Sequence, residues 1–179
     1  MQSIQTVSEN TIYVGASDRR LAKFENLFPI PRGVSYNAYV ILDEKTALLD
    51  TADASVGAQF LENVAAALDG RKLDYLIVDH MEPDHAAMIE AVLVRWPDLR
   101  LVVNAKTLPM LKMYFPTDSA AIDDALVVKE GDTLDLGKHK LTFVMAPMVH
   151  WPEVMMTFDT TTGTCLLYTS DAADDTPCV

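Results

Sequence analysis

Residues 73–85 read LDYLIVDHMEPDH, an apolar run followed by a polar segment, whose last six residues (80–85) contain two histidines and two acidic residues. The run over 73–78 is almost continuously apolar, which is typical of a strand that is buried on both faces of its sheet. Residues 86–96 then carry apolar side chains at helical spacing, so that residues 80–85 form a strand-to-helix turn. Ligands of open α/β sheets bind outside the carboxyl ends of strands. The sequence therefore predicts a ligand site at this turn, and two imidazoles beside two carboxylates indicate a metal.

Strands and helices alternate along the rest of the chain, which predicts a mixed α/β fold with no domain boundary before Thr164. Pro97 and Pro116 end two of the helices, and Gly70 suits the end of another. The predicted strands are 11–16, 35–42, 46–50, 73–78, 101–104, 126–128, 140–145 and 154–159, and the predicted helices are 55–68, 86–96 and 107–115.

Composition limits the classes of function that the chain can have. The chain has 179 residues, of which 50% are hydrophobic, so one domain with a real core is expected and disorder is not. A net charge of −12 argues against nucleic acid or an anionic membrane as a partner. The start of the chain lacks the basic and apolar regions of a signal peptide, and no apolar stretch is long enough to span a membrane. A cytoplasmic protein is the default expectation.

The side chains at positions 80, 82 and 84 are two residues apart, so in an extended segment they point the same way. His80, Glu82 and Asp84 can therefore converge on one pocket, with His85 adjacent at the start of the helix. Mixed imidazole and carboxylate ligands suit iron, manganese or zinc, and four candidates fit two ions that share a site. The alternative is a solvated acidic loop that happens to contain two unrelated histidines.

Three residues outside the turn have open interpretations. His150 is either a hydrogen-bonded structural histidine or, because it follows a second strand, a third imidazole of the same site. Asp50 ends a strand and either orients a metal ligand from behind or serves as a turn residue. His139, between two lysines, is most simply a solvated turn residue.

The pattern His80-x-Glu82-x-Asp84-His85, followed by residues 147–152 (PMVHWP), resembles the metal domain of flavodiiron proteins. These proteins belong to the metallo-β-lactamase-like superfamily, and the resemblance covers residues 11–164. Hydrolases of the superfamily typically carry histidine where Glu82 stands. A carboxylate there adds a hard oxygen ligand, which moves the preference from di-zinc hydrolysis towards redox iron.

The resemblance implies an αββα sandwich, C-terminally incomplete in this chain, with two Fe ions at one edge. His80, Glu82 and His150 would hold one iron, and Asp84 and His85 would lie at the other, although the histidine matching His85 is not always a ligand in the family. Flavodiiron proteins reduce O₂ to water, NO to N₂O, or both. Their electrons come through FMN in a flavodoxin-like domain, from a donor such as rubredoxin or a flavin reductase, within head-to-tail homodimers.

The last residues depart from the family pattern. Flavodiiron proteins have a metal-bridging aspartate where Thr169 stands, and Asp171 comes two residues late. The run CLLYTSDAADD, which begins at Cys165, also resembles a translated sequencing-library adapter. We therefore expect a partial di-iron domain over residues 1–164, a non-native tail over residues 165–179 that includes both cysteines, and no flavodoxin-like domain. The alternative is a genuine strand with Asp171 as a displaced bridge.

Parent protein and fragment are therefore expected to differ. The parent is expected to be an oxidoreductase that acts on O₂ or NO, whereas a fragment with an incomplete site should bind metal weakly and be inactive alone. Two alternatives stay open for the parent: a di-zinc hydrolase of the same superfamily, and a non-catalytic scaffold or binding domain.

Overall fold

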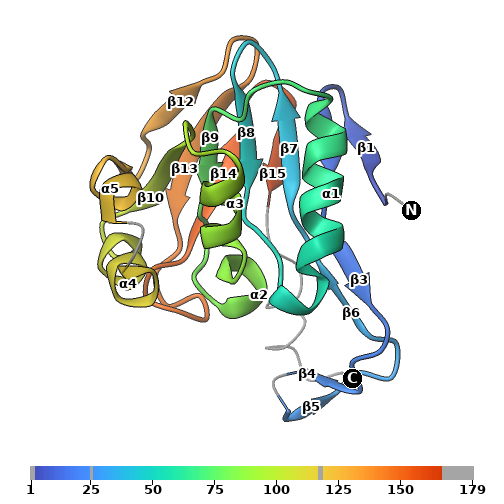
Figure 1. The fold of residues 1–179 in the computed structure, drawn as a ribbon. Helices are drawn as coiled ribbons and strands as arrows, with labels where there is room; N and C mark the ends of the chain where they lie inside the picture. Colours follow the sequence, from blue (N-terminus) through green and yellow to red (C-terminus); the bar gives the residue numbers. More distant parts are fainter. Residues whose placement is uncertain (1–2, 25, 117–118, 167–179) are drawn as a thin grey trace.

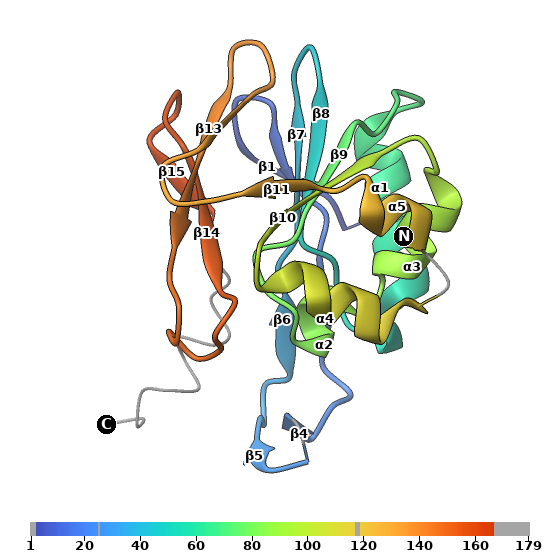
Figure 2. The ribbon, with the colours of Figure 1, turned by 90° about the vertical axis from the view of Figure 1, so that its left-hand side faces the viewer.

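The computed structural model describes residues 3–24, 26–116 and 119–166. Its strands and helices are arranged in layers (Figures 1 and 2). The strands are β1 (Gln5–Ser8), β2 (Thr11–Tyr13), β3 (Ala16–Asp18), β4 (Lys23–Phe24), β5 (Phe28–Pro29), β6 (Val34–Tyr36), β7 (Tyr39–Leu42), β8 (Thr46–Leu49), β9 (Tyr75–Ile77), β10 (Arg100–Asn104), β11 (Leu126–Val128), β12 (Thr133–Asp135), β13 (Lys140–Met145), β14 (Met155–Asp159) and β15 (Thr164–Leu166). The helices are η1 (Ala54–Val56), α1 (Gly57–Leu68), α2 (Pro83–Ala86), α3 (Ile89–Arg95), α4 (Thr107–Tyr114) and α5 (Ser119–Asp123).

The larger sheet has seven strands in the order β1-β2-β7-β8-β9-β10-β11. The pairs within β1-β2-β7-β8 are antiparallel, and those within β8-β9-β10-β11 are parallel. Parallel strands end at the same edge of a sheet, so the segments that follow β8, β9 and β10 lie together. In Figure 1, α2 lies at this edge.

The second sheet, in the order β12-β13-β14-β15, is antiparallel and packs against the face of the large sheet that α1 and α3 leave uncovered (Figure 2). Buried strands of the large sheet therefore contribute side chains to two cores, one under the helices and one between the two sheets. In β9 and just after it, Leu76 and Val78 join the core under the helices, whereas Ile77 faces the second sheet. Phe60 of α1 belongs to the first core, and Phe143 of β13 belongs to the second.

These layers confirm the predicted metallo-β-lactamase-like fold class. The described residues form one of the two helical layers of an αββα sandwich. Among the described residues, no helix covers the outer face of the second sheet (Figure 2). In the described part of the chain, no helix is both long enough and apolar enough to cross a membrane.

The predicted elements are largely present, and the differences have local causes. The strand predicted over 11–16 is two strands, β2 and β3, which pair with β7 and β6 respectively. Gly15 lies between them because a Cβ there would lie 1.9 Å from the carbonyl oxygen of Tyr36. The helix predicted over 86–96 begins earlier, at Pro83, and is interrupted between α2 and α3. The strands β1, β4, β5, β12 and β15 and the helix α5 are too short to give a clear periodic signal, and the sequence does not predict them.

The strand β15 includes Cys165 and Leu166, the first two residues of the predicted non-native tail. Leu166 pairs with Thr157 and packs into the core between the sheets. Residues 167–179, with Thr169 and Asp171, lie outside the described residues. The non-native origin of the tail therefore stays a prediction.

His139 is buried, and the prediction that it is a solvated turn residue is wrong. Its side chain is 3% exposed, and its Nδ1 lies 2.8 Å from Asp159 Oδ2 at the end of β14. Its backbone amide donates to Asp43 Oδ2 at 2.6 Å, in the turn between β7 and β8. The residue thus connects the two sheets at the end of the sandwich opposite α2 (Figure 1).

We expect Asp159→Asn to lower the free energy of unfolding at pH 7 by about 1–3 kcal/mol, because it removes a charged acceptor buried beside His139. Burial opposes ionisation of Asp159, but hydrogen bonds from Thr162, His139 and the Thr161 amide outweigh it and hold the pKa of this carboxyl below its ordinary value. The ionised Asp159 side chain stabilises the fold fully at pH values above the ordinary pKa of an aspartate. This contribution is lost as the pH falls through the lower pKa that Asp159 has in the folded protein. The free energy of unfolding, measured with urea between about pH 5 and pH 2, should therefore fall less with pH in the variant than in wild type. Equal losses in both proteins would contradict this role.

Candidate metal centre

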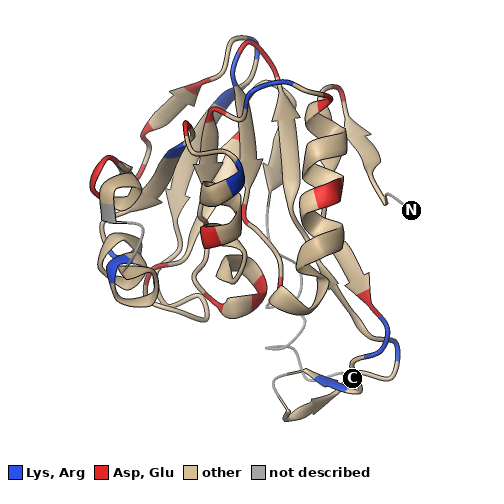
Figure 3. Cartoon of the chain, in the orientation of Figure 1, with Lys and Arg blue, Asp and Glu red and all other residues tan. Residues whose placement is uncertain are grey.

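The turn after β9 places its polar side chains at the end of the parallel strands. Glu82 is the last extended residue, with φ −62° and ψ 146°, and Pro83 is the first residue of α2. Proline suits this position because its fixed φ is already helical and its missing N–H is not needed there. Asp84 lies in the first turn of α2, where the helix dipole favours negative charge. In Figure 3 this helix has an acidic position and no lysine or arginine.

Three of the predicted site residues form one compact group. Glu82 Oε2 lies 3.0 Å from His80 Nε2 and 2.7 Å from His150 Nε2. One ligand atom of each of the three residues lies within 4.8 Å of the others. His80 and Glu82 are buried, and the side chain of His150 is 25% exposed. The structure therefore brings His150 to the 80–85 turn, which favours the second of the two interpretations that the sequence left open.

A strained loop between β13 and β14 carries His150. His150 has φ 79° and Met148 has φ 64°, in the left-handed region that side chains disfavour. The Met148 amide donates to the Trp151 carbonyl at 2.9 Å, which closes the loop. The Trp151 ring then meets the His80 ring edge-on, with 5.2 Å between centroids. Left-handed residues of this kind cluster at functional sites, where the surrounding structure holds them.

Asp84 and His85 form a second group beside the first. His85 Nε2 lies 3.5 Å from Asp84 Oδ2, and the rings of His85 and His80 are 5.3 Å apart. Asp50, just after β8, places Oδ2 3.1 Å from His85 Nδ1 and accepts the Asp79 amide at Oδ1 at 2.7 Å. Of the two interpretations of Asp50, this position favours the one in which it orients a neighbouring imidazole.

Glu153 is a buried residue of the site that sequence reasoning missed. Its Oε1 lies 2.8 Å from His80 Nδ1 and accepts the Met81 amide at 3.1 Å. Burial opposes ionisation of Glu153, but these hydrogen bonds outweigh it and lower the pKa of the carboxyl. The one sequence signal for it was an acidic residue in an otherwise apolar loop, three positions after His150.

The donor set fits a metal cation. His80 has a carboxylate at each ring nitrogen, Glu153 at Nδ1 and Glu82 at Nε2. A neutral imidazole donates from one nitrogen only, so the other nitrogen presents a lone pair towards a carboxylate. A cation between them satisfies both groups, and the carboxylate behind the ring fixes its orientation. His85 repeats this arrangement with two aspartates. Imidazole with carboxylate suits iron, manganese and zinc.

Asp79 carries a buried carboxyl directly before His80. Its Oδ1 accepts the Thr157 hydroxyl at 2.8 Å, and its carbonyl accepts the Met155 amide at 3.0 Å, which ties the second sheet to the end of β9. Burial, and then the nearby Asp50 carboxylate, raise the pKa of Asp79 well above its ordinary value.

Cavities lie against the 80–85 turn and against Trp151. One of about 470 Å³ reaches Glu82 and Asp84 and is lined elsewhere by Leu21, Phe24 and Tyr36. Burial, with a smaller effect of the Asp53 charge, raises the pKa of Tyr36 to about 12, so its phenol is neutral at physiological pH. A second cavity of about 220 Å³ is apolar and lies against Trp151. The acidic site thus faces one mixed cavity and one apolar cavity.

Comparison with known proteins gives one consistent answer. The family described as ODP family beta lactamase matches residues 34–174. The anaerobic nitric oxide reductase flavorubredoxin of Klebsiella pneumoniae is 35% identical over 168 residues, which cover 93% of this chain and 34% of that protein. The nitric oxide reductase of Moorella thermoacetica is 36% identical over 154 residues, which cover 85% of this chain and 38% of that protein. The chain thus spans about a third of the length of these relatives.

A solved structure agrees with these relatives. The rubredoxin oxygen:oxidoreductase of Desulfovibrio gigas superposes with a TM-score of 0.81 at 31% identity, and the match covers 88% of this chain and 38% of that one. These relatives do not favour the alternative that the protein is a di-zinc hydrolase.

Proposed function

The chain belongs to the ODP family of beta-lactamase-like domains, and from this premise we propose that the protein reduces O₂ to water, NO to N₂O, or both. The reaction would take place at a non-haem di-iron site supplied with electrons by FMN. The relatives support this class, since their names are those of nitric oxide and oxygen reductases.

The observation that carries the proposal is the position of Glu82 between two imidazoles. Its carboxylate lies within 3.0 Å of His80 and 2.7 Å of His150, where di-zinc hydrolases of this superfamily typically carry a third histidine. A hard anionic oxygen at that position favours iron over zinc. We propose His80, Glu82 and His150 as ligands of one metal, and Asp84 and His85 as residues at the second.

A pair of irons would supply two electrons to a bound diatomic, and the residues of this chain would prepare the site for it. Glu82 and Asp84 lower the net charge of the site, and Asp50 holds the His85 ring. The edge of Trp151 limits rotation of the His80 ring. The larger cavity, which Glu82 and Asp84 line, is our candidate for the substrate pocket.

We also propose a cytoplasmic location, a head-to-tail homodimer and an electron donor such as rubredoxin or a flavin reductase. The resemblance to flavodiiron proteins supports each of these. The name of the Desulfovibrio gigas relative supports rubredoxin as the donor of that protein.

The proposal is tested on the full-length product of the gene, reconstituted anaerobically with ferrous iron. We expect iron and FMN in the protein, and consumption of O₂ or NO when a reduced flavin donor is supplied, with N₂O formed from NO. Zinc with hydrolytic activity would favour the hydrolase instead. Full iron occupancy without reductase activity, even with a donor, would favour a scaffold.

A further inference from the structure

We propose that Glu153 is a positioning residue of the metal centre. It holds His80 in the tautomer that directs Nε2 towards Glu82 and His150. This inference rests on the proposed function, because it assigns Glu153 a role towards the metal that His80 would bind. Glu153 and His80 are 73 residues apart in the sequence, yet both side chains are fully buried and their polar atoms are 2.8 Å apart.

The hydrogen bonds of Glu153 decide which nitrogen of His80 carries the proton. Oε1 accepts the backbone amide of Met81 at 3.1 Å, so this oxygen faces His80 as an acceptor too. The Nδ1 atom of His80 must then carry the proton. The lone pair of Nε2 then points towards Glu82 Oε2, which is 3.0 Å away. This is the side of the ring on which a cation would bind.

Glu153 can hold the ring in place because its own backbone is fixed. The side-chain amide of Asn104, at the end of β10, donates to the Glu153 carbonyl. The Asn104 side-chain oxygen accepts the amides of Lys106 and Thr107 at 2.8 and 3.1 Å, at the start of α4. Lys106 Nζ also donates to the Pro152 carbonyl at 3.1 Å. The end of β10 and the start of α4 thereby support His80 through Glu153.

A carboxylate behind a metal-bound histidine does two separable things: it fixes the ring and raises its basicity. Glu153→Gln can keep the acceptor oxygen and removes only the charge, whereas Glu153→Ala removes both. Asp159→Asn is a matched control, because Asp159 is also a buried carboxylate 2.8 Å from a histidine Nδ1 but lies at the far end of the sandwich.

The experiment titrates this chain with cobalt(II) alone and follows the visible absorption of the bound ion. We expect Glu153→Ala to weaken cobalt binding by about 10–100-fold, Glu153→Gln to weaken it less, and Asp159→Asn to leave it within about twofold of wild type. Long-range ¹H–¹⁵N correlation spectra of the metal-free proteins give the tautomer of His80. We expect a proton on Nδ1 in wild type and Glu153→Gln, whether or not Nε2 also carries one, and its loss in Glu153→Ala. Circular dichroism confirms that each variant is folded.

Several results would overturn the inference. These are a His80 ring without a proton on Nδ1 in the wild type, cobalt binding by Glu153→Ala that matches wild type, and an equal loss in Asp159→Asn, which would indicate general destabilisation. Absence of cobalt binding by the wild type would overturn the metal site as well. Neither readout depends on turnover. A full-length protein without reductase activity but with the expected cobalt and tautomer results would overturn the proposed function alone, and unchanged cobalt binding in an active reductase would overturn only the role of Glu153.

Discussion

Replacing Glu82 with alanine is expected to weaken metal binding by more than about 100-fold, a larger loss than removal of a residue behind a ligand causes. Glu82 is the one carboxylate of the compact group and lies within hydrogen-bonding distance of both imidazoles. Without it, the compact group keeps two imidazoles and loses its one carboxylate ligand. Competition with a chromophoric chelator, under anaerobic conditions with ferrous iron, measures the change in the dissociation constant.

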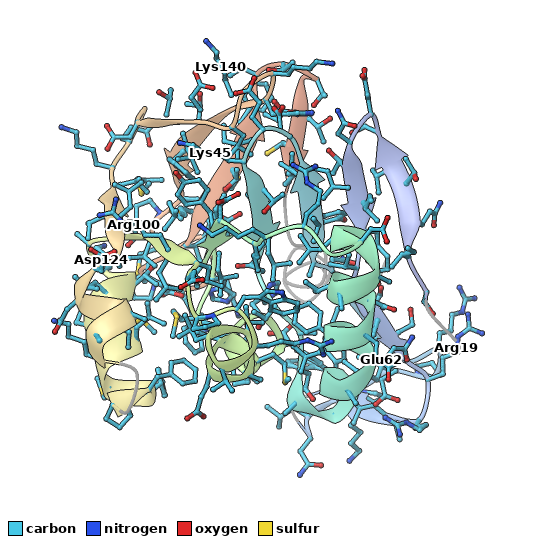
Figure 4. All side chains as sticks on the ribbon, turned by 45° about the horizontal axis from the view of Figure 1, so that its top comes forward. Arg19, Lys45, Glu62, Arg100, Asp124 and Lys140 are labelled. Atoms are coloured by element: carbon cyan, nitrogen blue, oxygen red, sulfur yellow. The ribbon has the colours of Figure 1, made fainter. Side chains whose placement is uncertain are left out.

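The matched control for this substitution is Glu62→Ala. Glu62 is exposed on α1, where Figure 4 labels it, so its removal changes the net charge of the protein by the same amount. This control should bind iron as tightly as wild type. If both variants bind equally well, the site assigned to Glu82 does not exist. If both lose affinity equally, the effect is one of overall charge.

Replacing Phe143 with alanine is expected to lower the free energy of unfolding by about 3–5 kcal/mol. Phe143 is completely buried between the two sheets, and its loss would leave a cavity lined by the β-strands on either side. Since whole domains are stabilised by only about 5–15 kcal/mol, this change is a large share of the total. Urea unfolding followed by circular dichroism measures it.

Phe158 provides the comparison within the same sheet. It is partly exposed on β14, beside Thr142, and faces away from the core between the sheets. Phe158→Ala should therefore cost only about 1 kcal/mol. Similar losses in the two variants would contradict the packing of the second sheet on the first.

The sequence predicted the parts of the site that are close together in the chain. The alternation of His80, Glu82 and Asp84 after a buried strand predicts that these three side chains converge, but Asp84 already lies in α2 and pairs with His85 instead. The structure places His80 and Glu82 3.0 Å apart. Strand-to-helix turns are local structures, and their geometry follows from a few residues such as Pro83 at the first helical position.

Long-range contacts were harder to predict from a single sequence. Nothing near Glu153 shows that its carboxyl reaches His80, which is 73 residues away. His139 has lysines on both sides, as a surface residue would have, yet its Asp159 partner makes burial possible. His150 could be assigned to the site only through the resemblance to a known family or through the topology that joins β13 and β14 to β9.

The most direct test of the metal centre is anomalous X-ray scattering at the iron edge, from crystals of this chain loaded anaerobically with ferrous iron. We predict an anomalous peak at coordination distance from His80 Nε2, Glu82 Oε2 and His150 Nε2. A peak elsewhere on the molecule, or no peak in crystals whose iron content is confirmed, would contradict the metal centre described here.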